Sequence, residues 1–230
     1  MERNRAKTII LVPVYNERGE ILRNTLGTLR ESGFPIVVID DGSENDLSPY
    51  LSGIDGVTVL RHPVNLGQGA ALQTGMDYAL EAGAEAVVHF DADGQHDARE
   101  IPALLDALAN GADLALGSRF LRKEDKASIP WGRRLLLRGA RHVNFLFTGQ
   151  WLSDAHNGFR ALNRKAMEKI RITENRMAHA TEIVALARKA SLRIVEVPVH
   201  IQYTEYSRAK GQNWQQSLNI LLELLLNKLF

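Results

Sequence analysis

Two aspartates separated by one residue, Asp91 and Asp93, carry the strongest chemical signal in the sequence. They follow the apolar run Val87–Phe90, and Gly94 comes directly after them. The run predicts a buried strand, and ligands bind at the carboxyl ends of strands in open α/β sheets. Paired carboxylates there suit Mg²⁺ or Mn²⁺, which keep coordination positions for water and substrate phosphates. A solvated Asp-Ala-Asp-Gly turn is the alternative interpretation.

Polar residues also follow two other predicted strands. The first strand ends Val12-Pro13-Val14-Tyr15-Asn16-Glu17, and the second ends Ile39-Asp40-Asp41-Gly42-Ser43. Three polar strand ends in succession favour a shared site over ordinary loop polarity. An aspartate at a strand end can accept hydrogen bonds from ribose hydroxyls or a base edge. The run His62–Ala71 then opens a helix with small residues, whose N–H groups favour a nearby phosphate, although its glycines could also be plain helix caps.

The elements that position these residues can be read from the hydrophobic pattern. Short β-rich runs alternate with helical patterns through the first half, which predicts an α/β fold: βαβ units in a mostly parallel, Rossmann-like sheet with helices on both faces. The expected strands are Thr8–Val14, Ile36–Ile39, Val57–Leu60, Ala86–Phe90 and Leu114–Leu116. The expected helices between them are Glu20–Ser32, Gly69–Ala82 and Glu100–Ala109. After Ser118 we expect a basic amphipathic helix at Pro130–Phe147, a strand at Gly158–Leu162, a helix at Ala178–Ala190, a strand at Leu192–Ile201 and a final helix.

Composition narrows the class of protein. The chain has 230 residues, 45% of them hydrophobic, which is enough to bury a substantial core in one large domain. A net charge of +1 gives no general argument for nucleic acid, and none is expected as a partner. The absence of cysteine excludes disulfides, thiolate metal sites and cysteine nucleophiles. We find no signal-peptide pattern and no run near the ~20 apolar residues that span a bilayer, so we expect a cytoplasmic protein that at most lies on a membrane surface.

Five motifs, in this order, resemble those of the inverting glycosyltransferases of family 2. They are Pro-Val-Tyr-Asn-Glu at 13–17, Asp-Asp-Gly-Ser at 40–43, Asn-Leu-Gly-Gln-Gly-Ala-Ala at 65–71, Asp-Ala-Asp-Gly-Gln-His at 91–96 and Gly-Ser-Arg-Phe at 117–120. The resemblance is greatest to the branch of polyprenyl-phosphate sugar synthases and covers roughly Thr8 to Gly211. It implies a GT-A fold, a UDP- or GDP-linked sugar donor and a divalent cation, Mg²⁺ or Mn²⁺.

The resemblance also implies roles for residues on the donor side. Asp91, Asp93 and Gln95 would hold the metal, and the two aspartates would be catalytic through it. The residues expected to bind the nucleotide sugar are Pro13, Tyr15, Glu17, Asp40, Asp41, Asn65, Gly69, Asp91, Ala92, Arg208 and Lys210. The last two belong to a loop that resembles the family's mobile loop over the diphosphate, where a lid would exclude water. An exposed charged loop is the plain alternative.

The acceptor is expected to meet the second half of the chain. By resemblance, Arg119 and the pair Arg133 and Arg134 bind a lipid phosphate, and Glu182 is a further acceptor contact. Arg133 and Arg134 lie in the basic amphipathic stretch, which suits an anionic membrane surface, although a solvated helix face is the alternative. Asp154 is the candidate base if the acceptor is a sugar hydroxyl, which must lose a proton as it attacks. A phosphate acceptor is already anionic and needs little such help.

We therefore expect a single GT-A domain over residues 1–230. Residues 1–118 would form the nucleotide-sugar-binding half, 119–212 the acceptor half with the lid loop, and 213–230 an amphipathic tail helix that packs on the domain or lies in a membrane interface. The expected activity is metal-dependent, inverting transfer of a hexose to a polyprenyl phosphate in cell-envelope glycan synthesis. It would take place on the inner face of the cytoplasmic membrane, where a small membrane protein could retain the chain. The alternatives are transfer to a saccharide hydroxyl and a non-catalytic nucleotide-sugar-binding module.

Overall fold

The structure is a computed structural model, and it describes residues 7–51, 53–121, 145, 149–154, 157–176 and 178–202. Within these residues seven strands form one sheet in the order β3-β2-β1-β4-β6-β5-β7. The strands are β1 (Thr8–Val14), β2 (Ile36–Asp40), β3 (Val57–Arg61), β4 (Ala86–His89), β5 (Leu114–Ser118), β6 (Arg160–Asn163) and β7 (Ile194–Pro198). All neighbours pair in parallel except β6, which runs antiparallel to both β4 and β5. The expected mostly parallel sheet is confirmed.

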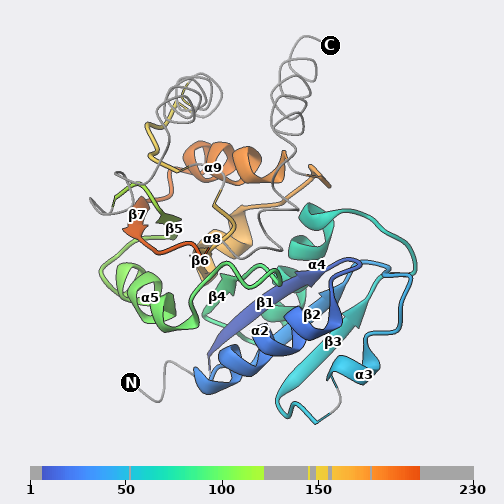
Figure 1. Ribbon diagram of the computed structural model, residues 1–230. Coiled ribbons are helices and arrows are strands. Elements are labelled where there is room, and N and C mark those ends of the chain that lie inside the picture. The colour runs from blue at the N-terminus through green and yellow to red at the C-terminus, as the bar shows by residue number, and fades with distance from the viewer. Residues whose placement is uncertain are drawn as a thin grey trace, which may run out of the picture.

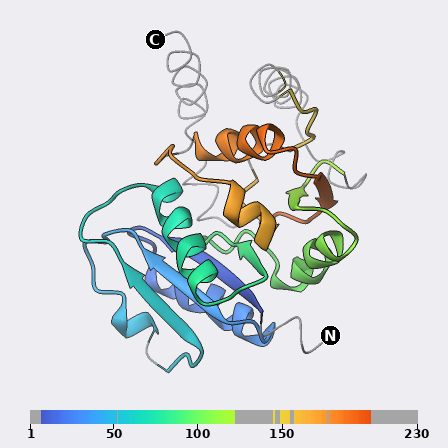
Figure 2. The ribbon, with the colours of Figure 1, turned by 180° about the vertical axis from the view of Figure 1, so that it is seen from behind.

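Helices cover both faces of this sheet (Figures 1 and 2). The described helices are α2 (Gly19–Glu31), α3 (Ser48–Leu51), α4 (Gln68–Glu81), the 3₁₀ helix η1 (Ala98–Glu100), α5 (Ile101–Ala109), α8 (Arg164–Lys169) and α9 (His179–Lys189). Apolar residues of α4, α8 and α9 pack in one core cluster on one face. Those of α2 and α5 pack in a second cluster on the other face. The result is a three-layer α/β/α arrangement, as the alternating pattern predicts.

Local sequence explains how the helices meet the sheet. Helix α2 buries Leu22, Leu26 and Leu29, which recur at helical spacing. Helix α4 instead lies very close to the strands, because a Cβ at Gly75 would stand 3.0 Å from side-chain carbons of Ile39 and Leu11. The absence of a side chain at Gly75 thus lets the middle of α4 pack directly on β1 and β2.

Two short α-helices, α3 and α8, and the 3₁₀ helix η1 were not expected from the sequence. Helix α8 has six residues, too few to show a periodic pattern, and it begins at a cap in which Asn163 Oδ1 accepts the N–H of Ala166 at 2.8 Å. Helix α3 has only four residues. The expected helix at Pro130–Phe147, apart from Phe145, and the tail helix at 213–230 lie outside the described residues.

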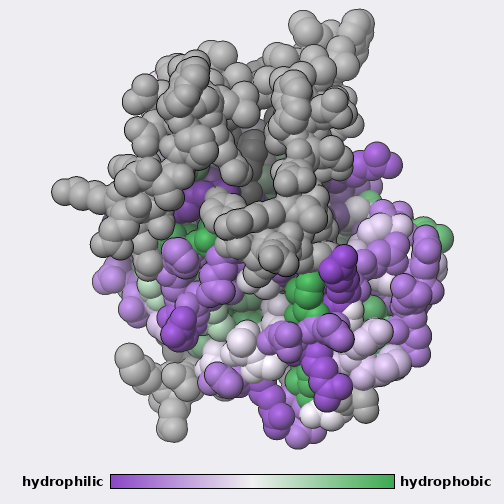
Figure 3. All heavy atoms as spheres, in the orientation of Figure 1, coloured by the Kyte–Doolittle hydropathy of each residue, from purple (hydrophilic) through white to green (hydrophobic). Residues whose placement is uncertain are grey.

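The described surface in the view of Figure 3 is mostly hydrophilic, with hydrophobic residues in small separate spots. In the described part of the chain, no helix combines the length and the apolar character needed to cross a membrane.

Candidate functional site

The carboxyl ends of β2, β1 and β4 lie side by side at one edge of the sheet (Figure 1). The register pairs Val14 with Asp40 and Leu11 with His89, so the segments that follow these strands leave the sheet close together. The side chain of Asn16 joins two of them, because its Oδ1 accepts the N–H of Glu44 at 2.9 Å. The three polar strand ends therefore converge, as the sequence predicts.

Asp91 lies at the centre of this edge and is held from two sides. Gln68 Nε2, at the start of α4, donates to Asp91 Oδ1 at 2.9 Å. His96 Nε2 lies 3.1 Å from Asp91 Oδ2, and its ring stacks on Phe159 with ring centroids 5.0 Å apart. A Cβ at Gly158 would stand only 2.1 Å from Asp91 Oδ2, so a larger residue there would displace this carboxylate. The carboxylate has a fixed orientation.

Electrostatics favour the ionised form of this carboxylate. Burial alone would raise the pKa of Asp91, but the hydrogen bond and charge of His96, with the charges of Arg160 and His179, lower it to about 2. Asp91 is therefore a carboxylate at neutral pH and can serve as an oxygen ligand or hydrogen-bond acceptor.

The turn after Asp91 is fixed to α2. Gly94 adopts a φ of 72°, a left-handed conformation that favours glycine, and the N–H of Gln95 donates to Asp93 Oδ1 at 3.1 Å. Thr25 Oγ1 on α2 donates to the carbonyl oxygen of Ala92 at 3.2 Å. Asp93 and Gln95 are half-buried, so both can be reached from solvent.

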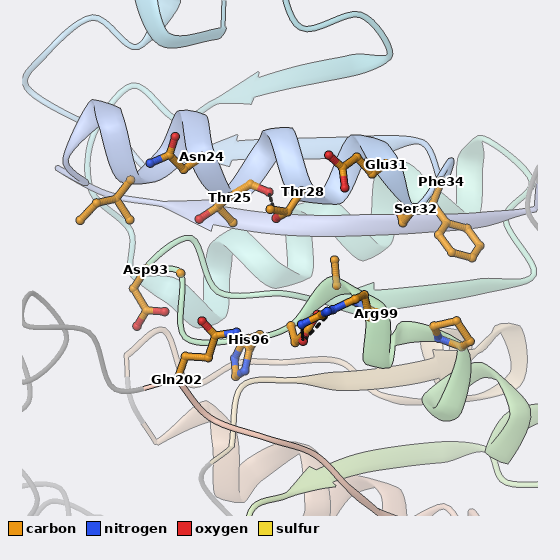
Figure 4. A pocket seen from close by; sticks show the side chains of 15 residues that line it. Asn24, Thr25, Thr28, Glu31, Ser32, Phe34, Asp93, His96, Arg99 and Gln202 are labelled. Carbon is orange, nitrogen blue, oxygen red and sulfur yellow. Dashed lines mark hydrogen bonds and ion pairs between the residues drawn. The ribbon is translucent and has the colours of Figure 1, made fainter.

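A groove of about 700 Å³ runs between α2 and the segment from Asp93 to Pro102. Figure 4 shows Asn24 and Thr28 of α2 on one side of it and His96 and Arg99 on the other, with Asp93 at one end. The groove touches the predicted metal ligands only through Asp93 and the neighbouring turn.

Asp41 binds the protein's own backbone. Its Oδ1 accepts the N–H of Leu66 at 2.9 Å, and its Oδ2 accepts the N–H of Gly67 at 2.7 Å. His62 Nδ1 lies 2.7 Å from Oδ1 and links the carboxylate to Thr74 through its other nitrogen. The sequence predicts a phosphate near this helix start, and in this structure the side chain of Asp41 accepts the N–H groups of Leu66 and Gly67 just before the helix.

The glycines of the same run permit a close approach between two segments. The N–H of Gly69 donates to the carbonyl oxygen of Asn175 at 2.9 Å. A Cβ at Gly67 would stand 2.1 Å from that oxygen, and one at Gly69 would stand 2.0 Å from the carbonyl oxygen of Glu174. These contacts explain the glycines without a phosphate, and the N–H of Gly69 is engaged here.

The other residues predicted to bind the nucleotide sugar differ in exposure. Tyr15 and Asn65 are exposed and Glu17 is half-buried, whereas Pro13 and Ala92 are buried. Asp40 is also buried; its Oδ1 accepts the N–H of Ser43 at 2.9 Å, and its Oδ2 lies 3.5 Å from Arg61 Nε. All of them lie at or just beyond the carboxyl ends of the strands, and their contacts with a nucleotide stay predictions.

The acceptor side is dominated by an ion pair. Arg119 follows β5, and its Nε donates to Asp154 Oδ2 at 2.7 Å while its Nη2 donates to Oδ1 at 3.3 Å. Asp154 is buried. Glu196 on β7 fixes the segment that carries Asp154, since its Oε1 accepts the N–H groups of Ser153 at 2.8 Å and Asp154 at 3.1 Å. Asp154 is thus held in place and engaged by a cation.

Glu182 on α9 binds the loop that approaches α4. Its carboxylate accepts the N–H of Thr173 at 3.0 Å and the N–H of Glu174 at 2.9 Å. His179 is buried, and its Nδ1 lies 2.7 Å from the carbonyl oxygen of Arg176. The structure therefore gives Glu182 a role in ordering this loop, and its contact with an acceptor stays a prediction.

Four further residues contribute to the site and were not singled out from the sequence: Gln68, His96, Arg160 and Glu196. Gln68 and His96 lie inside motif segments and Arg160 lies in the expected strand at Gly158–Leu162, but nothing local shows which carboxylate each side chain reaches. Glu196 lies in an ordinary strand and gives no signal. The predicted residues Arg133, Arg134, Arg208 and Lys210 lie outside the described residues.

The donor set at the sheet edge fits a hard divalent cation. Asp91, Asp93 and Gln95 offer two carboxylates and an amide oxygen in one turn, the ligand types that Mg²⁺ and Mn²⁺ prefer. In the described part of the chain, no three side chains of His, Asp or Glu gather closely enough to hold a metal by themselves. A cation here would therefore need ligands from a substrate as well, which is how Mg²⁺ is usually bound with phosphates.

Comparison with solved structures identifies the fold. The crystal structure of GalNAc-T7 with UDP, GalNAc and Mn²⁺ matches with a TM-score of 0.55 and 15% identity, covering 88% of this chain and 45% of that one. A 4-diphosphocytidyl-2C-methyl-D-erythritol synthase matches with a TM-score of 0.54 and 14% identity, covering 94% of this chain and 98% of that one. The chain has the GT-A fold, as the sequence predicts.

Comparison with known sequences is more specific. The model of glycosyl transferase family 2 matches residues 9–171. A polyprenol monophosphomannose synthase of Mycolicibacterium smegmatis is 31% identical, covering 92% of this chain and 84% of its own. A UDP-N-acetylglucosamine–dolichyl-phosphate N-acetylglucosaminyltransferase of Methanococcus voltae is 28% identical, covering 96% of this chain and 95% of its own. The chain belongs to glycosyltransferase family 2 and is a glycosyltransferase.

Proposed function

We propose that the protein transfers a hexose from a UDP- or GDP-linked donor to a polyprenyl phosphate, with inversion at the anomeric carbon and with the help of Mg²⁺ or Mn²⁺. The relatives named above act on polyprenyl or dolichyl phosphates by their names, and their matches cover nearly the whole chain. The observation that carries the choice of acceptor is the ion pair of Arg119 and Asp154.

That ion pair bears on the acceptor because the two acceptor classes need different chemistry. A sugar hydroxyl must lose its proton as it attacks, so it needs a carboxylate that is free to accept one. Asp154 is buried, and Arg119 donates to both of its oxygens. A phosphate oxygen is already a nucleophile, and the guanidinium of Arg119 is suited to bind it. The geometry favours the phosphate.

On the donor side, the proposed metal ligands are Asp91, Asp93 and Gln95. When bound, the cation would offset the negative charge that develops on the departing nucleotide diphosphate. Gln68 and His96 fix the orientation of the Asp91 carboxylate, and the bond from Thr25 to Ala92 fixes the turn on α2. This prior ordering reduces the rearrangement that the site would otherwise undergo when the donor binds.

Inversion is proposed from a direct displacement. A phosphate oxygen of the acceptor forms a bond to the anomeric carbon while the bond from that carbon to the nucleotide diphosphate breaks. The attack comes from the side opposite the leaving group, so the product has the inverted configuration. No protein side chain forms a bond to the sugar in this scheme.

The polyprenyl chain of such an acceptor would place the protein on a membrane surface. Arg133 and Arg134, as part of a basic amphipathic stretch, would meet lipid headgroups, and Arg208 and Lys210 would close over the donor. Location on the inner face of the cytoplasmic membrane, and retention there by a small membrane protein, are parts of the same proposal.

The test is a transfer assay with the full chain. Radiolabelled UDP- and GDP-sugars are mixed with a polyprenyl phosphate in detergent and Mn²⁺, and the label that enters organic solvent is counted. We expect one donor to give organic-soluble label that is lost with EDTA. A parallel reaction contains a saccharide acceptor in place of the polyprenyl phosphate. Label that is transferred only in that reaction would show the hydroxyl-acceptor alternative. Nucleotide binding without transfer to either acceptor would support the non-catalytic alternative.

A further inference from the structure

A buried arginine lies where the donor and acceptor sides of the site meet. Arg160 is only 1% exposed and is the bulkiest of the fully buried side chains among the described residues. It opens β6, the strand inserted between β4 and β5, where it pairs with His89 on one side and with Leu116 on the other. Its partner on β4, His89, lies two residues before Asp91. Its partner on β5, Leu116, lies three residues before Arg119.

The guanidinium is incompletely bonded, although it is buried. Its Nε donates to the carbonyl oxygen of Asn157 at 2.8 Å, while its Nη1 has no hydrogen-bond partner among the described residues. An arginine kept only for stability would be expected to bond fully, because an unpaired buried donor carries a desolvation cost. The observed arrangement favours a role in the site.

The segment that leads into Arg160 meets a carboxylate on each side of the site: Gly158 passes against Asp91 Oδ2, and Asn157 Nδ2 donates to Asp154 Oδ2 at 3.5 Å. Burial lowers the pKa of Arg160 to about 10, against the opposing effect of Asp91 and Asp154, so the side chain is charged at neutral pH. One of these carboxylates comes from the donor side and the other from the acceptor side. Each has its own hydrogen-bond donors, namely Gln68 for Asp91 and Arg119 for Asp154.

We propose that Arg160 is a positioning residue that couples Asp91 to Asp154, so that a change at the acceptor carboxylate alters the placement of the donor carboxylate. This inference rests on the proposed function. It assigns to β6 a role beyond completing the sheet, because no other described strand has neighbours on both sides of the site.

The coupling can be measured apart from turnover. Binding of UDP, and in parallel GDP, with Mn²⁺ is measured by calorimetry for the wild type, Asp154→Asn, Arg160→Met and the double variant. Fixed charges act additively in such a cycle, so a non-additive result reports a change in position. Asp154→Asn should change the Kd for the nucleotide by some factor in the wild type and by a smaller factor in Arg160→Met. We expect these two factors to differ at least about threefold.

A second comparison separates charge from structural support. Arg160→Met removes the bond to the carbonyl oxygen of Asn157 and a cation that faces two carboxylates, so we expect a lower Tm than that of the wild type. We also expect kcat to fall about tenfold or more, with part of the loss recovered in Arg160→Lys. Arg171→Met is the matched control, since Arg171 is exposed and pairs with Asp77 at 2.9 Å, and it should match the wild type in both binding and kcat.

The outcomes are distinguishable. Additive Kd changes, or an Arg160→Lys variant no more active than Arg160→Met, would overturn the coupling while leaving the proposed function intact. If Arg160→Met does not fold, the lysine variant in the same cycle gives the test. A wild type that binds neither nucleotide would overturn the proposed function and the coupling together.

Discussion

The donor and acceptor sides of the site treat their carboxylates differently. On the donor side, Asp91 and Asp41 receive hydrogen bonds from an amide, imidazole rings and backbone N–H groups. On the acceptor side, Asp154 is paired directly with the guanidinium of Arg119. The first arrangement orders the carboxylates through hydrogen bonds and does not pair Asp91 directly with an arginine or lysine among the described residues. The second neutralises the carboxylate and orders a cation.

This difference gives complementary chemistry to the two sides. An ordered carboxylate with its charge retained is suited to bind a divalent cation and, through it, a diphosphate. An ordered guanidinium is suited to bind a phosphate with two parallel hydrogen bonds. A transferase that moves a sugar between two phosphates needs both. Each side can therefore be tested by removing the charge that it is proposed to present.

The largest effect is expected for Asp91→Asn. The change keeps the size of the side chain and removes the charge that Gln68 and His96 orient. Because metal stabilisation of a leaving group contributes several kcal/mol, turnover should fall at least about a hundredfold. The measurement is kcat over a Mn²⁺ titration, with circular dichroism to verify the fold. Wild-type turnover of this variant at saturating Mn²⁺ would contradict the role given to the donor side.

A smaller loss of activity is expected when Asp91 keeps its charge and loses one of its hydrogen-bond donors. Gln68→Leu removes the hydrogen bond of 2.9 Å to Asp91 Oδ1. A hydrogen bond to a charged group contributes about 1.5–3 kcal/mol, so kcat/KM for the donor should fall roughly tenfold to a hundredfold. The KM for the acceptor should change much less, because it is affected only through the coupling proposed for Arg160. An equal change in both KM values would show that the two sides are not distinct in this respect.

The donor side was the more predictable of the two. Asp91 and Asp40 follow strands that can be recognised from short apolar runs, and alternating strands and helices predict parallel pairing. Their convergence then follows, because parallel strands that are neighbours end at the same edge. What could not be predicted is the bonding that orders them, since Gln68 and Asp41 reach their partners only after α4 has packed on the sheet.

The acceptor side depends on long-range pairing that local patterns do not encode. The strand at Gly158–Leu162 was expected, but its insertion between β4 and β5, antiparallel to both, was not. That insertion places Arg160 opposite His89. Likewise, nothing near Asp154 in the sequence indicates that Glu196 on β7 fixes it. The strands of the donor and acceptor sides could therefore be predicted about equally well, but the contacts of the acceptor side could be predicted less completely.

Asp154→Asn tests the acceptor side. If Asp154 orders Arg119, loss of its charge should raise the KM for the polyprenyl phosphate about tenfold and change kcat only a few-fold. If Asp154 is instead a general base, kcat should fall about a hundredfold or more, and the pH dependence of kcat should lose its acidic limb. A pH–rate profile of the variant and the wild type distinguishes the two.

The smallest effect on turnover is expected for a carboxylate at the opposite end of β5. Asp113 accepts hydrogen bonds from Asn163 Nδ2, Lys165 Nζ and the N–H of Arg193, each at 2.9 Å. Like Asp154 it is paired with a cation, but it lies away from the carboxyl ends of the central strands. Asp113→Asn should therefore leave kcat within about twofold of the wild type while lowering the free energy of unfolding at pH 7 by about 1–3 kcal/mol.

The pH dependence of that stability has a definite sign. Burial would raise the pKa of Asp113, but the N–H of Arg193 and the side chains of Asn163 and Lys165 lower it below the ordinary 3.8. A lowered folded-state pKa contributes stability that is complete above the unfolded-state value and is lost as the pH falls through the folded-state value. Urea denaturation should therefore separate wild type from Asp113→Asn at pH 7, and their free energies should converge below about pH 4. If the difference in unfolding free energy between the two proteins stays constant down to about pH 2.5, the loss comes from packing and not from the charge of Asp113. A large fall in kcat for Asp113→Asn would show that Asp113, like Asp154, has a functional role.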